Sequence, residues 1–379
     1  MSSTGGAGGL PLRYWAVEAV FSTPANEPAV ARKAIERRTD GMQSLLERYV
    51  VTRAELAARL DVPVAALAEL IEQPRAASAV MIDGEDAVAA DAASASRHAL
   101  AASDVLTGAA WPEMTLRFWR PAAAGGEDLV PPSGSLDAVV LPKVSRPDEV
   151  RAAGKALAAV EARRGMSPNA IRVCLLVETA RALAGLMPLV DAAGERLCAV
   201  MFGSADYAAD LGLTAGTGEA QMAWAAGTIV NAAAAAGVPA IAPMTVDFPV
   251  GRPGETAAAS RGHVLSALER VHRDALRAAE SGMAGKLVGH PAQLFAVLLA
   301  FGRAGTPDVL EGLAADVEAY QVALADGRGV LARDGRMIDR ATDRAARSVL
   351  RRAVANGRFD AGRAVHLGIV AAEDLLPKG

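Results

Sequence analysis

The chain has 379 residues, of which 52% are hydrophobic and 22% are charged, so it is long enough to bury a large core. Its net charge of −4 provides no long-range attraction to nucleic acid or to anionic lipid, which excludes both as general partners. No apolar run reaches the roughly 18 residues that a membrane-spanning helix needs.

The beginning of the chain and its cysteines predict where the protein works. Residues 1–11 are rich in glycine and lack the basic and apolar segments of an export signal, so we expect a disordered leader. The only two cysteines, Cys174 and Cys198, lie inside apolar runs, where a free thiol packs as a small hydrophobic group. These features together predict a reducing, cytoplasmic location.

Eight short β-rich runs follow one another along the chain, with helical patterns between them. They are Tyr14–Phe21, Ala79–Asp83, Thr115–Trp119, Ala138–Leu141, Arg172–Val177, Leu197–Phe202, Val238–Val246 and Lys286–Gly289. Most are continuous apolar runs, as expected for strands covered on both faces, and the alternation with helices indicates a parallel sheet. We therefore predict a (β/α)₈ TIM barrel over residues 12–291. A two-domain Rossmann-like enzyme is the alternative, but no G-x-G-x-x-G follows an early strand.

Two segments lie outside the eight repeats. The first is a helical insertion at about 32–74, in which Thr52–Ile71 resembles a helix-turn-helix. Its second helix, Val64–Glu72, is mostly Ala, Leu and Glu, which suits no phosphate contact, so we predict no nucleic-acid binding. The second segment, residues 292–379, is predicted to form a helical extension broken by a loop at Asp326–Asp339. We expect this extension to dock on the barrel or on a neighbouring subunit.

Acidic residues collect at the ends of the predicted strands, where the active sites of such barrels lie. The second strand ends in Asp83, Glu85 and Asp86, the fifth runs into Glu178, and the sixth leads to Asp206. Because neighbouring strands lie about 4.8 Å apart, the last two carboxylates can converge on one ion. Two carboxylates without a nearby His or Cys favour Mg²⁺, with Mn²⁺ as a second candidate, over Zn²⁺. The alternative is that these acids are solvated or paired with bases.

Other side chains add to this pattern or remove competing functions. Two cations accompany the acids: Arg117 in the third strand and Lys143 just after the fourth. The five histidines form no i, i+4 pair, which argues against a zinc site. No G-x-S-x-G is present, which argues against a serine hydrolase of the α/β class.

Seven segments, taken in chain order, resemble the citrate lyase beta subunit family of the HpcH/HpaI aldolase superfamily, which includes malyl-CoA lyases. They are MIDGEDAVAADAASASRHAL, LRFWR, VVLPKVSRPDEV, LLVETARAL, MFGSADYAADLG, GKLVGHPAQ and GRGVLARDGRMID. The chain departs from the family pattern at Phe21–Pro28, where FSTPANEP replaces an F-V-P-G type turn, and at Arg32–Pro74, which is longer. Both lie where the family's thioester arm is expected to run, so CoA, an acyl-carrier protein and no carrier all remain open.

The resemblance implies a Mg²⁺-dependent carbon–carbon lyase. Its substrate would be a 3-hydroxyacyl-CoA thioester, such as malyl-CoA or citramalyl-CoA, which is cleaved to, or formed from, an acyl-CoA and a 2-oxo acid. Glu178 and Asp206 would bind the metal. Arg117 would hold the substrate oxygen on which charge develops.

The resemblance also implies roles for the remaining charged residues. Glu85 and Asp86 would orient metal-bound waters, and Lys143 would be a supporting cation. Asp339 would enter the active site of the adjacent subunit as an acid–base group. The protein would therefore be a homo-oligomer, a trimer or a hexamer, with residues 292–379 as a swapped lid.

Two other functions remain open. The first is a metal-dependent aldolase that acts on a free 2-oxo acid without CoA and uses the same pair of carboxylates. The second is a catalytically inactive barrel used for binding, with Arg32–Pro74 as its partner surface. Retention of Glu178, Asp206, Arg117 and Asp339 argues against the inactive barrel, since a degenerate enzyme is expected to lose at least one of them.

Overall fold

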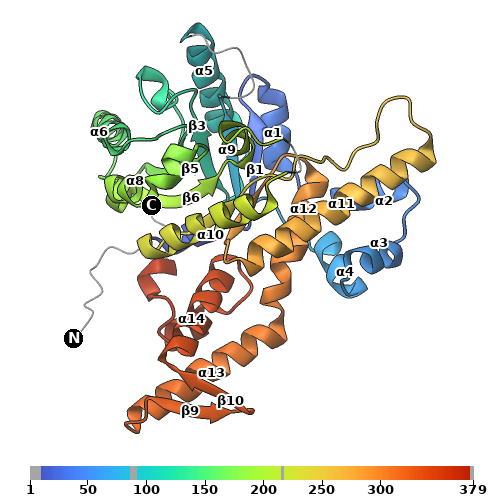
Figure 1. Ribbon diagram of the computed structural model, residues 1–379, viewed down its shortest axis with the longest axis vertical. Helices are drawn as coiled ribbons and strands as arrows, with labels where there is room; N and C mark the ends of the chain where they lie inside the picture. The colour runs from blue at the N-terminus through green and yellow to red at the C-terminus, as the bar shows by residue number, and fades with distance from the viewer. Residues whose placement is uncertain (1–9, 86–91, 215–216, 376–379) are drawn as a thin grey trace. The chain divides into compact units, whose positions relative to one another are not determined.

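The computed structural model describes residues 10–85, 92–214 and 217–375, which form two compact units. The barrel unit contains Val17–Ala300, and the C-terminal unit combines Pro11–Ala16 with Phe301 and the residues that follow it. The expected disordered leader lies almost entirely outside the described residues. Figure 1 shows the strands of the barrel unit with helices packed around them.

Eight parallel strands close into a barrel in the order β1 to β8, which confirms the predicted TIM barrel. They are β1 (Ala19–Pro24), β2 (Ala79–Asp83), β3 (Leu116–Arg120), β4 (Ala138–Leu141), β5 (Arg172–Val177), β6 (Leu197–Phe202), β7 (Ala240–Ala242) and β8 (Gly285–Val288). Every residue of β2, β4, β6, β7 and β8 is buried, because one face of each strand meets the barrel interior and the other meets a helix.

Four strands begin or end away from the predicted positions, and one of them, β8, lies one residue earlier than expected. β1 starts at Ala19, because Leu12–Trp15 forms a 3-10 helix, η1, that belongs to the C-terminal unit. β7 is confined to Ala240–Ala242. β3 lies one residue later than expected, which makes Arg120 the last residue of that strand.

Helices cover the outside of the barrel. They are α5 (Ala92–Gly108), α6 (Pro147–Arg163), α7 (Ala180–Ala184), α8 (Leu186–Ala193), α9 (Ser204–Asp210), α10 (Glu219–Ala236), α11 (Ala257–Glu280) and α12 (Pro291–Gly302), with short 3-10 turns η2 (Glu127–Leu129) and η3 (Gly194–Arg196). In α6 the apolar stripe of Val150, Ala153 and Leu157 is buried. Within the described ranges, the model contains no helix with the length and apolar character needed to span a membrane.

The insertion after β1 forms four helices: α1 (Pro28–Glu36), α2 (Gly41–Arg48), α3 (Arg53–Leu60) and α4 (Val64–Glu72). Thr52 caps α3 by accepting a hydrogen bond from the Glu55 backbone at 3.1 Å. Two ion pairs, Arg59 with Glu269 at 2.5 Å and Arg261 with Glu55 at 2.6 Å, tie α3 to α11. The helix pair that resembles a helix-turn-helix is thus part of the outer wall of the barrel.

The C-terminal unit has its own hydrophobic core. The elements of this unit are η4 (Arg303–Gly305), α13 (Pro307–Ala325), β9 (Val330–Arg333), β10 (Arg336–Asp339), α14 (Arg340–Ala355), α15 (Ala361–His366) and η5 (Ala372–Leu375). Where a loop was expected at Asp326–Asp339, β9 and β10 form an antiparallel hairpin in which Asp339 pairs with Val330. Asp334 and Gly335 both have positive φ, as a tight two-residue hairpin turn requires.

Candidate active site

Charged side chains gather at the carboxyl ends of successive barrel strands. Asp83 ends β2 and lies beside Arg120 at the end of β3. Lys143 follows β4, Glu178 follows β5, and Asp206 lies in the first turn of α9, which follows β6. Parallel strands in a closed barrel bring these ends to one face, so residues far apart in sequence surround a common centre.

The side chain of Arg120 links three of the acids. It is only 7% exposed, and its Nε and Nη2 atoms donate to the two carboxylate oxygens of Asp83 at 2.8 and 2.6 Å. Its Nη1 lies 3.1 Å from Glu85 Oε2 and 3.4 Å from Glu178 Oε1. A bidentate guanidinium is geometrically specific, so Arg120 fixes the acids of β2 and β5 relative to each other.

Lys143 contacts the same cluster with both its main chain and its side chain. Its backbone N–H donates to Glu178 Oε2 at 3.1 Å, and its Nζ lies 2.7 Å from Glu85 Oε1 and 3.9 Å from Asp206 Oδ1. Its φ of 51° is left-handed, a conformation that costs about 1–2 kcal/mol for a residue with a Cβ. Such strain persists where surrounding contacts enforce it, often at functional sites.

Glu178 is the most deeply buried acid of the cluster, with 1% of its side chain exposed. Burial, and then the negative charge of Glu85, raise the pKa of Glu178 to about 7 against the opposing effect of Arg120. Gly203 lies directly against it, because a Cβ on Gly203 would be 2.4 Å from Glu178 Cγ. The close approach of the β6–α9 turn therefore requires a glycine.

The charges in the cluster do not balance. Among its described members, the carboxylates are Asp83, Glu85, Glu178 and Asp206, and the cations are Arg120 and Lys143. When Glu178 is ionised, the cluster has a surplus of two negative charges, and this surplus and the all-oxygen donor set both fit a hard divalent cation. In the part of the chain that the structure describes, no three His, Cys, Asp or Glu side chains form a metal-binding group by themselves. An ion bound here would take two carboxylates and complete its coordination with substrate and water.

The structure brings together four of the residues expected at the site: Glu85, Lys143, Glu178 and Asp206. Asp86 lies outside the described residues. Arg117 is not brought to the cluster, since it is the second residue of β3 and its guanidinium lies 5.1 Å from the centre of the Trp111 ring.

Arg120, which was not among the residues expected at the site, contacts the acids of the cluster, whereas Arg117 lies at the Trp111 ring. The segment LRFWR contains both arginines, three residues apart, so they point to opposite faces of the strand. Of the two, Arg120 at the carboxyl end of β3 is the one that contacts Asp83 and Glu178.

Asp339 belongs to the C-terminal unit, where it ends β10 and caps α14. Its Oδ1 accepts hydrogen bonds from the backbone of Ala341 at 3.0 Å and of Thr342 at 2.9 Å, and the bonds from Thr342 are the main reason that its pKa is lowered. Buried Asp316 holds the hairpin by pairing with Arg333 and Arg336. The carboxylate of Asp339 is thus fixed at a rigid corner of its unit.

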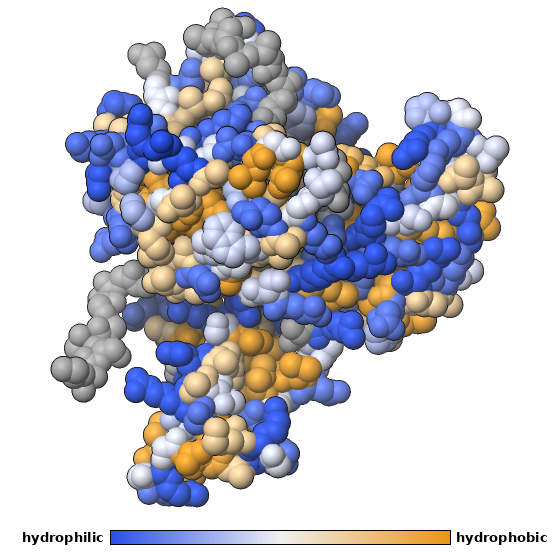
Figure 2. All heavy atoms as spheres, in the orientation of Figure 1, coloured by the Kyte–Doolittle hydropathy of each residue, from blue (hydrophilic) through white to orange (hydrophobic). Residues whose placement is uncertain are grey.

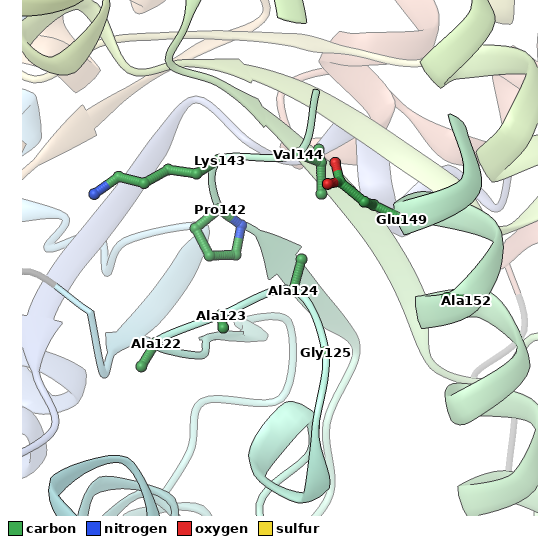
Figure 3. Close-up of a pocket in the computed structure, with 9 residues that line it drawn as sticks. All are labelled: Ala122, Ala123, Ala124, Gly125, Pro142, Lys143, Val144, Glu149 and Ala152. Carbon is green, nitrogen blue, oxygen red and sulfur yellow. The ribbon is translucent and has the colours of Figure 1, made fainter. Parts of the chain in front are cut away.

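A cavity of about 400 Å³ opens beside Lys143 (Figure 3). Its walls are the segments after β3 and β4 and the first turns of α6, with lining residues Ala122, Ala123, Ala124, Gly125, Pro142, Lys143, Val144, Glu149 and Ala152. Its size is within the range of small-molecule sites. Most of its lining side chains are small, and the charged ones are those of Lys143 and Glu149.

The raised pKa of Glu178 predicts how stability depends on pH in the metal-free protein. Between the ordinary pKa of 4.5 and the folded value of about 7, the folded chain keeps a proton that the unfolded chain has released. The free energy of unfolding should therefore fall by on the order of 3 kcal/mol as pH rises through this window. Thermal melts at pH 4.5–8 would measure this fall, and Glu178→Gln should remove it. Equal pH dependence in the two proteins would contradict the burial of an ionising Glu178.

A closed (β/α)₈ barrel with an acid and guanidinium cluster at the carboxyl ends of its strands is the arrangement of a TIM-barrel enzyme. The family model described as HpcH/HpaI aldolase/citrate lyase matches residues 65–261. The chain belongs to this family, and its class of activity is that of a carbon–carbon lyase.

Curated relatives carry a more specific name. The L-malyl-CoA/beta-methylmalyl-CoA lyase of Rhodobacter capsulatus is 30% identical over 240 residues, which cover 58% of this chain and 68% of that protein. The protein of the same name from Cereibacter sphaeroides is 28% identical over 246 residues, 60% of this chain and 70% of its own length.

Solved structures share the fold. A citrate lyase from Burkholderia xenovorans superposes with a TM-score of 0.56 at 22% identity and covers 76% of this chain and 87% of its own. The protein CitE from Mycobacterium tuberculosis, in complex with magnesium, acetoacetate and coenzyme A, gives a TM-score of 0.53 at 21% identity, with 92% and 99% covered.

Proposed function

We propose that the protein is a Mg²⁺-dependent lyase that cleaves, or in reverse forms, the C2–C3 bond of a 3-hydroxyacyl-CoA thioester such as malyl-CoA or citramalyl-CoA. The observation that carries this proposal is the surplus of two carboxylate charges beside a buried guanidinium at the end of the barrel. The names of the curated relatives support the choice of a CoA thioester. We place the reaction in the cytoplasm, where the buried free thiols Cys174 and Cys198 stay reduced.

The reaction defines what the site must supply. Cleavage removes the proton of the C3 hydroxyl, turns C3 into the carbonyl of a 2-oxo acid, and leaves the bonding electron pair as a thioester enolate. The enolate then takes a proton at C2 to give an acyl-CoA. Glu178 and Asp206 would hold Mg²⁺, or Mn²⁺, which supplies Lewis-acid polarisation of the substrate's oxygen atoms.

We assign the stabilisation of the enolate oxygen to Arg120, the role expected of Arg117. Its guanidinium is fixed by Asp83, so the positive charge needs no reorganisation when negative charge develops on the substrate. Glu85 holds Arg120 in place and pairs with Lys143 in the metal-free protein, and Lys143 remains a supporting cation beside the site. Asp86 keeps its expected role beside metal-bound water.

We further propose that Asp339 of a neighbouring subunit moves the proton at C2. Its lowered pKa makes it a carboxylate, so it would take this proton in the condensation direction and return it in cleavage. The C-terminal unit presents exposed apolar side chains on α13 and the hairpin, namely Val322, Leu324, Val330 and Met337. Figure 2 shows hydrophobic atoms among hydrophilic ones on the surface of the C-terminal unit. Exposed apolar groups of this kind support a subunit contact, in a trimer or a hexamer.

Mixing two inactive variants should restore activity if Asp339 acts across subunits. After dissociation and re-assembly of Arg120→Lys with Asp339→Asn, roughly a quarter of the sites should combine an intact barrel with an intact Asp339. Steady-state rates of the mixture, compared with each variant re-assembled alone, measure this recovery. Failure to recover in oligomers shown to contain both chains would place Asp339 away from the neighbouring site.

A mass-spectrometric screen of 3-hydroxyacyl-CoA thioesters with Mg²⁺ tests the proposed reaction. We expect acetyl-CoA or propionyl-CoA to appear together with glyoxylate, pyruvate or oxaloacetate. Cleavage of a free 2-oxo acid with no response to CoA would overturn the thioester in favour of a CoA-independent aldolase.

A further inference from the structure

We propose that Lys143 is an exchangeable counter-cation. Its ammonium group occupies the carboxylate cluster before a divalent ion binds, and moves into the adjacent cavity when the ion takes its place. This inference rests on the proposed metal-binding role of Glu178 and Asp206.

The contacts of Lys143 show why the two cations compete. Its Nζ lies 2.7 Å from Glu85 Oε1 and 3.9 Å from Asp206 Oδ1, and its backbone N–H reaches Glu178 Oε2 at 3.1 Å. The ammonium therefore lies beside one of the two proposed metal ligands, Asp206, and is paired with the neighbouring carboxylate of Glu85. The ammonium of Lys143 and a divalent ion held by Asp206 would be two cations side by side in a partly buried site. Because they would repel each other strongly, they cannot both occupy the cluster at once.

The two cations of the cluster differ in their freedom to move. Arg120 is 7% exposed and is held by both oxygens of Asp83, whereas the side chain of Lys143 is 52% exposed and ends in a single point charge on a flexible chain. The side chain of Lys143 can leave without disturbing Glu178, because the backbone N–H of Lys143, not its ammonium, holds that carboxylate. Lys143 is thus the cation that can be exchanged.

The cavity beside the cluster provides a place for the displaced ammonium. Lys143 itself lines this cavity of about 400 Å³, and Ala122, Ala123 and Ala124 leave room for a lysine side chain. In Figure 3, Lys143 extends away from Glu149, which lies on the other side of the Pro142–Val144 turn. The carboxylate of Glu149 already pairs with the Arg146 guanidinium at 2.9 Å and with the backbone of Ser145 and Arg146, so the displaced ammonium would enter the open cavity without forming a new ion pair there.

Acetylation of amines in the intact protein tests the exchange without any substitution. The chain has only five lysines, Lys33, Lys143, Lys155, Lys286 and Lys378, so each is followed separately by peptide mass spectrometry. Adding saturating Mg²⁺ to the metal-free protein should raise the acetylation rate of Lys143 severalfold, because its amine is then no longer paired with Glu85 and Asp206. Exposed Lys155 and buried Lys286 are internal controls whose rates should not change. An unchanged or lower rate at Lys143 would overturn the exchange.

A variant gives a second, independent measurement. Lys143→Met keeps the backbone N–H and most of the length of the side chain but removes the ammonium. The affinity for Mn²⁺, measured by electron paramagnetic resonance of the free ion, should therefore rise about tenfold or more. Lys155→Met should leave this affinity unchanged. Weaker binding by Lys143→Met would contradict competition. If the wild-type protein bound no Mn²⁺, the proposed function itself would fail, whereas normal Mn²⁺ binding with unchanged labelling of Lys143 would refute the exchange alone.

Discussion

Replacing Glu178 by Gln, or Asp206 by Asn, should reduce turnover about a thousandfold or more. Each change removes one of the two carboxylates proposed to hold the divalent ion, and metal-ion catalysis contributes several kcal/mol, with 1.4 kcal/mol for each factor of ten. Initial rates at saturating Mg²⁺, followed by mass spectrometry of the CoA products, measure the loss. A chelator should have the same effect on the wild-type protein, and added Mg²⁺ should reverse it.

Asp210→Asn is the matched control. Asp210 lies one turn after Asp206 on α9, where it accepts a hydrogen bond from the backbone of Ala180 at 2.8 Å and takes no part in the cluster. We expect this variant to keep near wild-type activity. Full activity of the wild-type protein in a chelator, or of the Asp206→Asn variant, would remove the basis for a metal role.

The second large effect is expected at Arg120 and not at Arg117. Arg120→Lys keeps a positive charge but loses the two parallel hydrogen bonds by which the guanidinium holds Asp83. We expect kcat to fall about a hundredfold to a thousandfold, as it does when an enzyme loses one donor to a developing oxyanion. Arg117→Lys should stay within about threefold of wild type, because its guanidinium lies over the Trp111 ring. Both rates are measured at the same saturating Mg²⁺.

Lysine is the substitution chosen at position 120 because it keeps a positive charge among the buried acids and so preserves the stability of the fold. Arg120→Ala would leave the buried acids around it without their partner, which typically lowers the free energy of unfolding by about 3–5 kcal/mol. Circular dichroism melts of the two lysine variants check that each remains folded at the assay temperature. If Arg117→Lys lost activity and Arg120→Lys retained it, the assignment of the enolate-stabilising role to Arg120 would be wrong.

Much of the fold and part of the site could be predicted from local sequence. The eight apolar runs and their spacing indicated the barrel because a strand buried on both faces must be apolar throughout. Glu178 and Asp206 could be predicted to lie near each other because Glu178 directly follows β5 and Asp206 lies in the first turn after β6, and closeness to a strand end is visible in the sequence.

The arginine could not be assigned in the same way. Both Arg117 and Arg120 lie in one strand, and only the observed end of β3 at Arg120 decides which of them reaches the acids. Moving the pairing register of a strand by one residue turns each of its side chains to the opposite face of the sheet. Apolar composition alone does not determine that register. The left-handed backbone of Lys143, which turns its N–H toward Glu178, also has no signal in the sequence.

The hairpin in the C-terminal unit had a signal that was overlooked. The dipeptide Asp334–Gly335 is among the strongest short signals for a two-residue β-turn, and both residues have the positive φ that such a turn needs. The flanking residues are too mixed in polarity to predict strands, so the segment was expected to be a loop. Asp339 is placed by this hairpin together with the α14 cap.

The space at Gly203 has a consequence for how this protein tolerates variation. A saturation mutational scan usually reveals an active site through reactive side chains whose replacement abolishes activity. Position 203 is a glycine and has no reactive side chain. Because even a methyl group there would overlap Glu178, alanine should inactivate the enzyme nearly as fully as loss of the carboxylate. A scan scored by growth or turnover should therefore detect an essential residue whose only contribution is the volume that it leaves empty.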